Sequence, residues 1–259
     1  MTTPSLRATS SGLPMANWAK PTFAKRKRLT KEGNCLLYKT VIGAVFMVIE
    51  KIVTKSYGTN VYICYDEASN VGVIIDPGND ADAIMNFVKE KGLEIKHILL
   101  THGHFDHILA AKAVAEQTGA PILAHADERE LLGDPELNFS RQAAREECSL
   151  SPDTLLHDGD TINFGGESFK VIATPGHTKG GVCFYSDADN VLFSGDTLFC
   201  ESVGRTDLPG GDFSAIEYSI RNKLYTLPPE TTVYPGHSRK TTIAHEMVSN
   251  PHIKSVKKL

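Results

Sequence analysis

Residues 101–107 read Thr-His-Gly-His-Phe-Asp-His, and this stretch says more about the fold and its chemistry than any other part of the chain. Three imidazoles and one carboxylate lie within six residues, a donor set that suits Zn, Fe or Mn. The stretch follows a predicted strand at 95–100, and loops at strand ends are where open α/β folds place reactive groups. We expect Gly103 to turn the loop tightly so that His102 and His104 converge. The stretch therefore predicts a metal site.

Three further segments place one ligand-type residue directly after a predicted strand and a glycine. They are Thr174-Pro175-Gly176-His177, Ser194-Gly195-Asp196 and Tyr234-Pro235-Gly236-His237. Taken singly, each is typical of an ordinary polar turn. Together they repeat one arrangement of strand, glycine turn and ligand. If the strands run side by side, all of these ligands converge at one edge of the sheets.

The remaining histidines test how selective this interpretation is. His97 lies inside a predicted strand, which favours a structural role. No role is assigned to the histidines that lack the strand and glycine context, which are His125, His157, His245 and His252. Asp76 is typical of a turn carboxylate, but it is also placed to hold a ligand histidine by its other ring nitrogen.

Hydrophobic periodicity predicts that strands and helices alternate in two similar halves. The first half has predicted strands at 48–54, 60–65, 71–75, 95–100 and 121–124, with helices at 80–91 and 106–118. Residues 133–153 are expected to form loop or short helix. The second half has predicted strands at 168–173, 182–186, 191–194 and 232–234, with helices at 213–225 and 241–248. This order is typical of an α/β fold in which helices cover the sheets.

Charge divides the 259 residues unevenly. Residues 1–46 carry eight Lys/Arg and one acidic residue, a net charge of +7, and the rest carries 19 basic and 30 acidic residues, or −11. We expect 1–46 to be a basic, disordered extension and 47–259 to be a single domain. A mis-assigned start codon is a hypothesis for the extension, because Met47 opens the periodic pattern. The net charge of −4 gives no reason to expect a nucleic-acid partner.

The cysteines and the hydropathy pattern indicate in which cellular compartment the protein is expected. The five cysteines are odd in number and none forms a CxxC pair, so a reducing, cytoplasmic compartment is expected rather than a disulfide framework. No apolar stretch is long enough to span a bilayer, so no membrane association is expected. The oligomeric state is left open.

Taken together, the chain resembles the metallo-β-lactamase-fold hydrolases. The motifs that carry the resemblance are THGHFDH at 101–107, TPGHTKG at 174–180, SGDTLF at 194–199, GRTDLPGGD at 204–212 and YPGH at 234–237. They occur in the family's order, and the resemblance covers about 47–259. It implies an αβ/βα sandwich of four layers with a metal site at one edge of the two sheets.

The resemblance also implies a ligand set for two metal ions. His102, His104 and His177 would bind the first ion. Asp106, His107 and His237 would bind the second, and Asp196 would bridge both. The ions are expected to be Zn, with Fe or Mn as alternatives.

Within the family the chain looks most like the short glyoxalase II-like (hydroxyacylglutathione hydrolase-like) group. This implies hydrolysis of a small thioester or ester by a hydroxide that bridges the two metal ions, with a water pKa lowered towards about 7. Asp106 is the expected catalytic residue, which would orient that hydroxide or take its proton. Only 22 residues follow His237, which leaves no room for the helical C-terminal domain with which full-length glyoxalase II grips glutathione, so we do not expect that domain here.

Other activities stay open on the sequence alone. A persulfide dioxygenase with one iron shares similar motifs, and a lactonase has nearly the same ligands. A non-catalytic metal-binding protein is the third alternative. Arg205, Arg239 and Lys240 are candidate contacts for an anionic substrate, and they fit equally well as solvated surface charges.

Overall fold

The computed structural model describes residues 47–144 and 146–253 of the chain. The predicted basic extension at 1–46 lies outside the described residues, as does the question of the start codon.

The first sheet holds six strands in the order β1-β2-β3-β4-β5-β6. Their bounds are β1 Met47–Val53, β2 Asn60–Asp66, β3 Val71–Ile75, β4 Glu94–Leu99, β5 Ile122–His125 and β6 Thr154–Leu156. The first three strands pair antiparallel, and β3, β4, β5 and β6 pair parallel. The carboxyl ends of these parallel strands therefore meet at one edge.

The helices α1 (Ala81–Lys91) and α3 (Ala111–Thr118) connect the parallel strands of this sheet. In α1 the buried residues are Ile84, Met85 and Val88, at spacings that place them on one helix face. The helix ends at Gly92, which adopts the left-handed conformation with φ 64°, a common helix terminator.

The second sheet also holds six strands, in the order β14-β13-β10-β9-β8-β7. Their bounds are β7 Thr161–Phe164, β8 Glu167–Ala173, β9 Val182–Ser186, β10 Val191–Gly195, β13 Thr232–Pro235 and β14 Thr241–Thr242. Only β10 and β13 pair parallel. The helices of this half are α6 (Phe213–Asn222) and α7 (Ile243–Ser249). Asp212 caps α6 by accepting hydrogen bonds from two backbone N–H groups, at 2.8 and 3.1 Å.

Short elements fill the connections. They are α2 Phe105–Ile108, the 3₁₀ turn η1 Ala126–Glu128, α4 Arg129–Gly133, α5 Ser140–Ala143, the hairpin β11 Leu198–Phe199 and β12 Ser202–Val203, and the 3₁₀ turn η2 Leu224–Thr226.

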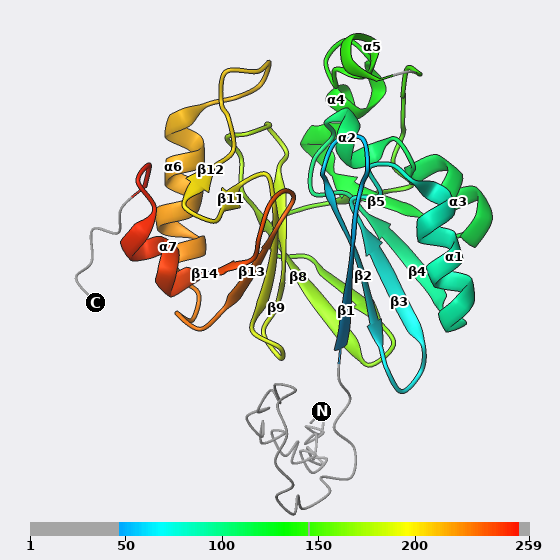
Figure 1. The fold of residues 1–259 in the computed structure, drawn as a ribbon. Coiled ribbons are helices and arrows are strands. Elements are labelled where there is room, and N and C mark those ends of the chain that lie inside the picture. Colours follow the sequence, from blue (N-terminus) through cyan, green and yellow to red (C-terminus); the bar gives the residue numbers. More distant parts are fainter. Residues whose placement is uncertain (1–46, 145, 254–259) are drawn as a thin grey trace, which may run out of the picture. The chain divides into compact units, whose positions relative to one another are not determined.

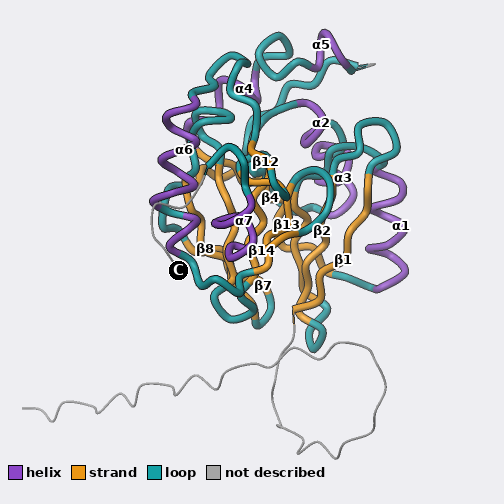
Figure 2. The backbone as a smooth tube through the Cα atoms, turned by 60° about the vertical axis from the view of Figure 1, so that its left-hand side comes forward, coloured by secondary structure: helices purple, strands orange, loops and turns teal. Residues whose placement is uncertain are grey.

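Three apolar clusters separate four layers. One joins the first sheet to α1 and α3, a second fills the space between the two sheets, and a third joins the second sheet to α6 and α7. Figure 1 shows α1 and α3 outside one sheet and α6 and α7 outside the other, and Figure 2 shows the strands between these helices. The predicted αβ/βα sandwich is confirmed.

The predicted helix at 106–118 is wrong in one respect, because the structure divides it into α2 and α3. The backbone N–H of Ala110 donates to the carbonyl of Pro77 at 2.9 Å, so the loop after β3 takes the hydrogen bond that would continue the helix. The strands β6, β7 and β14 were not predicted. They have two to four residues each, too few for a clear periodic pattern.

None of the helices in the described part of the chain is long and apolar enough to cross a bilayer. Cys64, Cys148, Cys183 and Cys200 are free thiols, which agrees with the expected lack of a disulfide framework over the described residues. The cytoplasmic location stays a prediction.

Phe169 anchors the layer between the sheets and supplies a test of this fold. Its ring is fully buried and lies 5.0 Å from that of Phe164 and 5.4 Å from that of Phe193, centroid to centroid. We expect Phe169→Ala to lower the free energy of unfolding by about 3–5 kcal/mol, because it leaves a cavity. Phe213, which is 48% exposed, is the matched control, with an expected loss of about 1 kcal/mol. Equal shifts in urea midpoint would contradict this core.

Candidate metal centre

The loops that follow four strands bring the seven predicted ligands to one edge of the sandwich. The loop after β4 carries His102 and His104, the short helix α2 that follows it carries Asp106 and His107, and the loops after β8, β10 and β13 carry His177, Asp196 and His237. Backbone hydrogen bonds join the two sheets beside them, from Asn60 to Gly236 at 2.7 Å and from Val182 to Thr101 at 2.8 Å. The expected convergence at one edge is therefore present, and the role of each residue as a ligand stays a prediction.

Three buried histidines form the first cluster. One nitrogen from each of His102, His104 and His177 lies within 4.8 Å of the others. Nδ1 of His104 and Nε2 of His177 are 2.9 Å apart. Three converging imidazole nitrogens make a site for a borderline metal ion such as zinc.

A carboxylate and two histidines form the second cluster, in which Asp106, His107 and His237 also have ligand atoms within 4.8 Å of one another. Oδ2 of Asp106 is 3.1 Å from Nε2 of His237 and 3.6 Å from Nε2 of His107. Thr59 supports this carboxylate by donating its hydroxyl to Oδ2 at 3.1 Å.

Asp196 lies between the two clusters. Its Oδ1 is 3.4 Å from Nε2 of His107, and its Oδ2 is 3.7 Å from Nε2 of His177 and 3.6 Å from Nε2 of His237. One carboxylate thus faces histidines of both clusters, which is the geometry that the predicted bridging role requires.

Buried atoms without partners show that the residues fit a metal centre. Nε2 of His102 and Oδ1 of Asp196 are buried and make no hydrogen bond. Burying a polar atom without a hydrogen-bond partner or a bound metal ion costs folding free energy. Because these atoms point into a group of nitrogen and carboxylate donors, the histidine and aspartate clusters fit a metal site.

The two clusters differ in charge. Burial, reinforced by the neighbouring histidines, lowers the pKa of His102 well below its ordinary value, and burial lowers that of His104 to about 3. In the second cluster burial again lowers the pKa of His107, but the carboxylates of Asp106 and Asp196 outweigh burial and raise this pKa well above its ordinary value. The hydrogen bond with Asp106 likewise overcomes burial and raises the pKa of His237. Protonation is therefore disfavoured at His102 and His104 and favoured at His107 and His237, so positive charge is favoured in the second cluster.

Hydrogen bonds from outside the clusters orient the ligand rings. Nδ1 of His107 is 3.0 Å from Oδ2 of Asp76, so the predicted contact between Asp76 and a ligand histidine is confirmed. Nδ1 of His177 donates to the carbonyl of Arg205 at 2.8 Å. In both rings this leaves Nε2 facing the cluster, an arrangement that fixes the tautomer of metal-binding histidines.

Glycine is required in two of the ligand loops for different reasons. Gly176 adopts φ +140°, and a Cβ there would overlap the backbone of Ile216. His102 and His104 converge as expected, with ring centroids 4.9 Å apart, but Gly103 does not adopt a positive φ, so left-handed backbone freedom is not what this position uses. A Cβ on Gly103 would instead lie 3.1 Å from the carboxylate of Glu128 and from the side chain of Leu132. The close approach of the Gly103 backbone to Glu128 and Leu132 is what favours glycine at this position.

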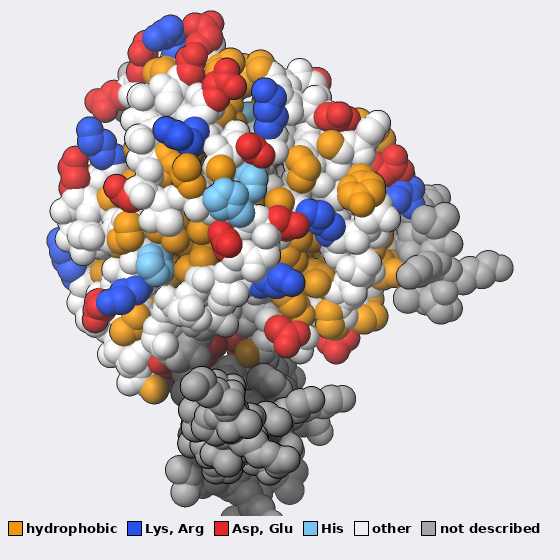
Figure 3. Space-filling model, turned by 180° about the vertical axis from the view of Figure 1, so that it is seen from behind, with side chains coloured by type: hydrophobic (Ala, Val, Ile, Leu, Met, Phe, Trp, Pro, Cys, Tyr) orange, Lys and Arg blue, Asp and Glu red, His pale blue; other side chains and the backbone are white. Residues whose placement is uncertain are grey.

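The second cluster opens into a cavity of about 530 Å³. Its walls include His104, Asp106, His177, Asp196 and His237 together with Tyr57, Phe105, Phe139, Ala143, Arg205 and Leu208. The four large apolar residues of this wall were not predicted to line a site: Phe105 lies within the ligand motif at 101–107, and Tyr57, Phe139 and Leu208 come from segments that carry no ligand motif. Only a little histidine surface shows on the face drawn in Figure 3, since the first cluster is buried.

The three basic residues proposed for an anionic substrate do not lie together. Arg205 lines the cavity beside His177, although its guanidinium also pairs with Asp207 at 2.7 and 2.8 Å. Arg239 and Lys240 line a separate cavity of about 480 Å³.

The histidines to which no role was assigned lie outside the two clusters. Within the described ranges, His125 accepts a hydrogen bond from Asp127 N at the start of η1, and His245 pairs with Glu201 at 2.9 Å. Cys200, Glu201 and His245 do bring three ligand-type atoms together, but Glu201 and His245 are exposed.

Comparisons with known sequences show which proteins the chain is similar to. The profile of the Metallo-beta-lactamase superfamily matches residues 56–237. A Bacillus subtilis protein described as the probable metallo-hydrolase YqgX is 40% identical over 182 residues, which cover 70% of this chain and 86% of that protein. The hydroxyacylglutathione hydrolase GloC of Haemophilus influenzae is 34% identical over 214 residues, which cover 81% of this chain and 99% of GloC.

Solved structures show the same likeness. The crystal structure of the B3 metallo-beta-lactamase BLEG-1 superposes with a TM-score of 0.75 at 41% identity, covering 79% of this chain and 98% of BLEG-1. The crystal structure of TTHA1623 in a di-iron-bound form superposes with a TM-score of 0.70 at 35% identity, covering 79% of this chain and 100% of TTHA1623. The crystal structure of ETHE1 from Myxococcus xanthus superposes with a TM-score of 0.67 at 32% identity, covering 79% of this chain and 84% of ETHE1.

The raised pKa values of His107 and His237 lead to a prediction about protons. Because a raised pKa favours the protonated ring, we expect a metal ion that binds His107 and His237 at pH 7 to displace protons, and the apparent metal affinity should rise with pH. Calorimetric titration of metal-free protein with Zn²⁺ in two buffers of different ionisation enthalpy measures the released protons. Heats that do not depend on the buffer would contradict the charged second cluster.

The central position of Asp196 leads to a prediction about metal content. We expect Asp196→Ala to bind about one metal ion or fewer per chain where the wild type binds about two, because a shared ligand is lost from a two-metal site. Elemental analysis after dialysis measures the ratio. His245→Ala is the control and should keep the wild-type ratio. An Asp196→Ala protein with full metal content and near-normal turnover would rule out the bridging role.

Proposed function

The chain belongs to the metallo-beta-lactamase superfamily of metal-dependent hydrolases, and on that premise we propose that it hydrolyses a small thioester of the S-2-hydroxyacylglutathione type. The observation that carries the proposal is the pair of adjacent clusters joined by Asp196 at the wall of a substrate-sized cavity. Two complete ligand sets favour a two-metal hydrolase over an enzyme with a single iron.

Two bound divalent ions would acidify the attacking water and polarise the substrate carbonyl. We propose Zn for both positions, with Fe or Mn as alternatives, because nitrogen and carboxylate donors suit all three. The relative with a di-iron-bound structure is a reason to test iron directly.

Asp106 is the proposed catalytic residue of the chain. Burial alone would raise its pKa, but the charge on His107 and the hydrogen bond from His237 lower it well below the ordinary value. A carboxylate that stays ionised is a good hydrogen-bond acceptor and a poor store for a proton. Asp106 therefore serves mainly to orient the attacking water, while Thr59 holds its Oδ2 in place.

The cavity suits an acyl group with a polar end. Tyr57, Phe105, Phe139 and Leu208 give it apolar walls beside the carboxylates, and Arg205 supplies a positive charge. A volume of about 530 Å³ lies within the range of small-molecule sites. The match to GloC, a hydroxyacylglutathione hydrolase, over 99% of its length supports the proposal.

Ring opening of a β-lactam is a second candidate activity. It is favoured by the 41% identity to BLEG-1, a B3 metallo-beta-lactamase, over 98% of that chain. Lactam and thioester hydrolysis both attack an acyl carbon, so one site is compatible with either.

The proposal is tested by thiol release from S-lactoylglutathione. We expect metal-loaded protein to release the thiol rapidly, chelator-treated protein to be inactive, and added Zn²⁺ or Fe²⁺ to restore the rate, because the water is acidified only when metal is bound. A chain that binds two metal ions but releases no thiol would overturn the thioester assignment. Parallel assays with a chromogenic cephalosporin, a lactone and, by oxygen consumption, glutathione persulfide would then identify the substrate class.

A further inference from the structure

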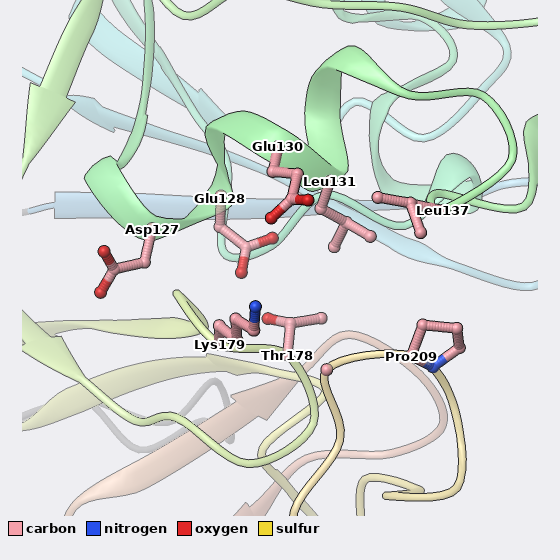
Figure 4. Close-up of a pocket in the computed structure, with 9 residues that line it drawn as sticks. Asp127, Glu128, Glu130, Leu131, Leu137, Thr178, Lys179 and Pro209 are labelled. Atoms are coloured by element: carbon pink, nitrogen blue, oxygen red, sulfur yellow. The ribbon is translucent and has the colours of Figure 1, made fainter.

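Glu128 is a buried carboxylate that lies behind the three-histidine cluster. It closes the 3₁₀ turn η1 directly after β5 and is only 1% exposed. Figure 4 shows it pointing from the segment that leads into α4 towards the loop that carries Thr178 and Lys179. Burial raises the pKa of this carboxyl above its ordinary value. Placing an ionisable group there is costly, which calls for a physical reason.

Two backbone N–H groups, one from each ligand loop, donate to this carboxylate. Gly103 donates to Oε2 at 2.8 Å, and Gly180 donates to Oε1 at 2.7 Å. Gly103 lies between His102 and His104, and Gly180 follows His177 by three residues. A single side chain therefore connects the loop after β4 in the first sheet with the loop after β8 in the second.

Both loops approach the Glu128 segment closely: a Cβ would collide with backbone at Gly180 and would be tightly packed against side chains at Gly103. A Cβ on Gly103 would lie 3.1 Å from Oε2 of Glu128, and a Cβ on Gly180 would lie 2.7 Å from the Glu128 backbone nitrogen. The two glycines thus let the loops reach the carboxylate. This contact gives a reason for a glycine at both positions.

We propose that Glu128 is a positioning residue that sets the distance between the two loops and thereby the affinity of His102, His104 and His177 for a metal ion. The inference rests on the metal centre of the proposed function. The second cluster has its own supports, since Asp76 holds His107 and Thr59 holds Asp106. Loss of Glu128 is therefore expected to act on one cluster and spare the other.

The test is Glu128→Gln in the full chain. The amide keeps the size of the side chain, but its NH₂ group faces a backbone N–H donor, so one of the two hydrogen bonds is replaced by a repulsive contact. Zn²⁺ titration of metal-free protein against a chromophoric chelator measures the two affinities. We expect one of them to weaken about 10- to 100-fold, the usual effect of losing an outer partner of a metal ligand, and the other to stay within about twofold. The absorption of Co²⁺-loaded protein should lose the bands of one site only.

Glu246→Gln is the matched control. Glu246 is also fully buried, and it accepts hydrogen bonds from Glu201 N at 2.9 Å and Thr241 Oγ1 at 2.6 Å. It touches neither ligand loop of the first cluster, so its substitution should lower the melting temperature without changing either Zn²⁺ affinity.

Each outcome separates the two proposals. A wild-type chain that binds no Zn²⁺ overturns the proposed function itself. A wild type with two sites and a Glu128→Gln protein with unchanged affinities overturns the role of Glu128 alone. Equal weakening of both sites would show a general structural effect and also overturn it. If the variant does not fold, Gly103→Ala keeps the carboxylate but pushes the loop away from it. The same selective loss is then expected, and unchanged affinities would refute the inference.

Discussion

The carboxylate of Asp76 accepts hydrogen bonds from the Thr101 backbone at 2.7 Å and the Thr101 hydroxyl at 2.6 Å, and it contacts Nδ1 of His107 at 3.0 Å. It lies at the end of β3, is 2% exposed, and adopts φ +50°, which is unusual for a residue other than glycine. Backbone strain of this kind persists only where the surroundings hold it. The contact fixes the end of β4 and one ligand ring against the neighbouring strand, and the remaining ligand loops are placed relative to that edge.

The same edge concentrates polar groups whose burial opposes folding of the metal-free chain. Four of the five clustered histidines are at most 5% exposed, and some of their atoms have no partner. Metal ions that bind the folded chain and not the unfolded one offset this cost by mass action. The fold therefore brings together buried ligand-type atoms whose hydrogen-bonding capacity is not fully used by the protein itself. It can do so because the apolar layers on both sides of each sheet provide most of the stability elsewhere.

Periodicity predicted sheets covered by helices, and the glycines after strands predicted that the candidate ligands would converge if the strands lie side by side, whereas the four-layer sandwich was implied by the family resemblance. Three features were not predicted from the sequence, each for a physical reason. Glu128 has no local signature, since its two partners come from loops in different sheets. The break between α2 and α3 depends on the carbonyl of Pro77, about thirty residues earlier in the chain. Gly103 was assigned to a turn, although what it provides is room for a carboxylate that only the folded chain brings near.

In the cavity, the candidate metal ligands and most of the apolar wall come from different segments of the chain. The motifs therefore predict a reaction better than they predict a substrate. The groups that would bind metal and orient water come from the segments directly after β4, β8, β10 and β13. The walls come from elsewhere, with Tyr57 in the β1–β2 turn, Phe139 beside α5 and Leu208 in the loop before α6. Loops of this kind accept changes without disturbing the sheets. A chain can therefore keep the chemistry of one site while its walls change. This is how relatives described as a hydroxyacylglutathione hydrolase and a B3 metallo-beta-lactamase can both resemble it.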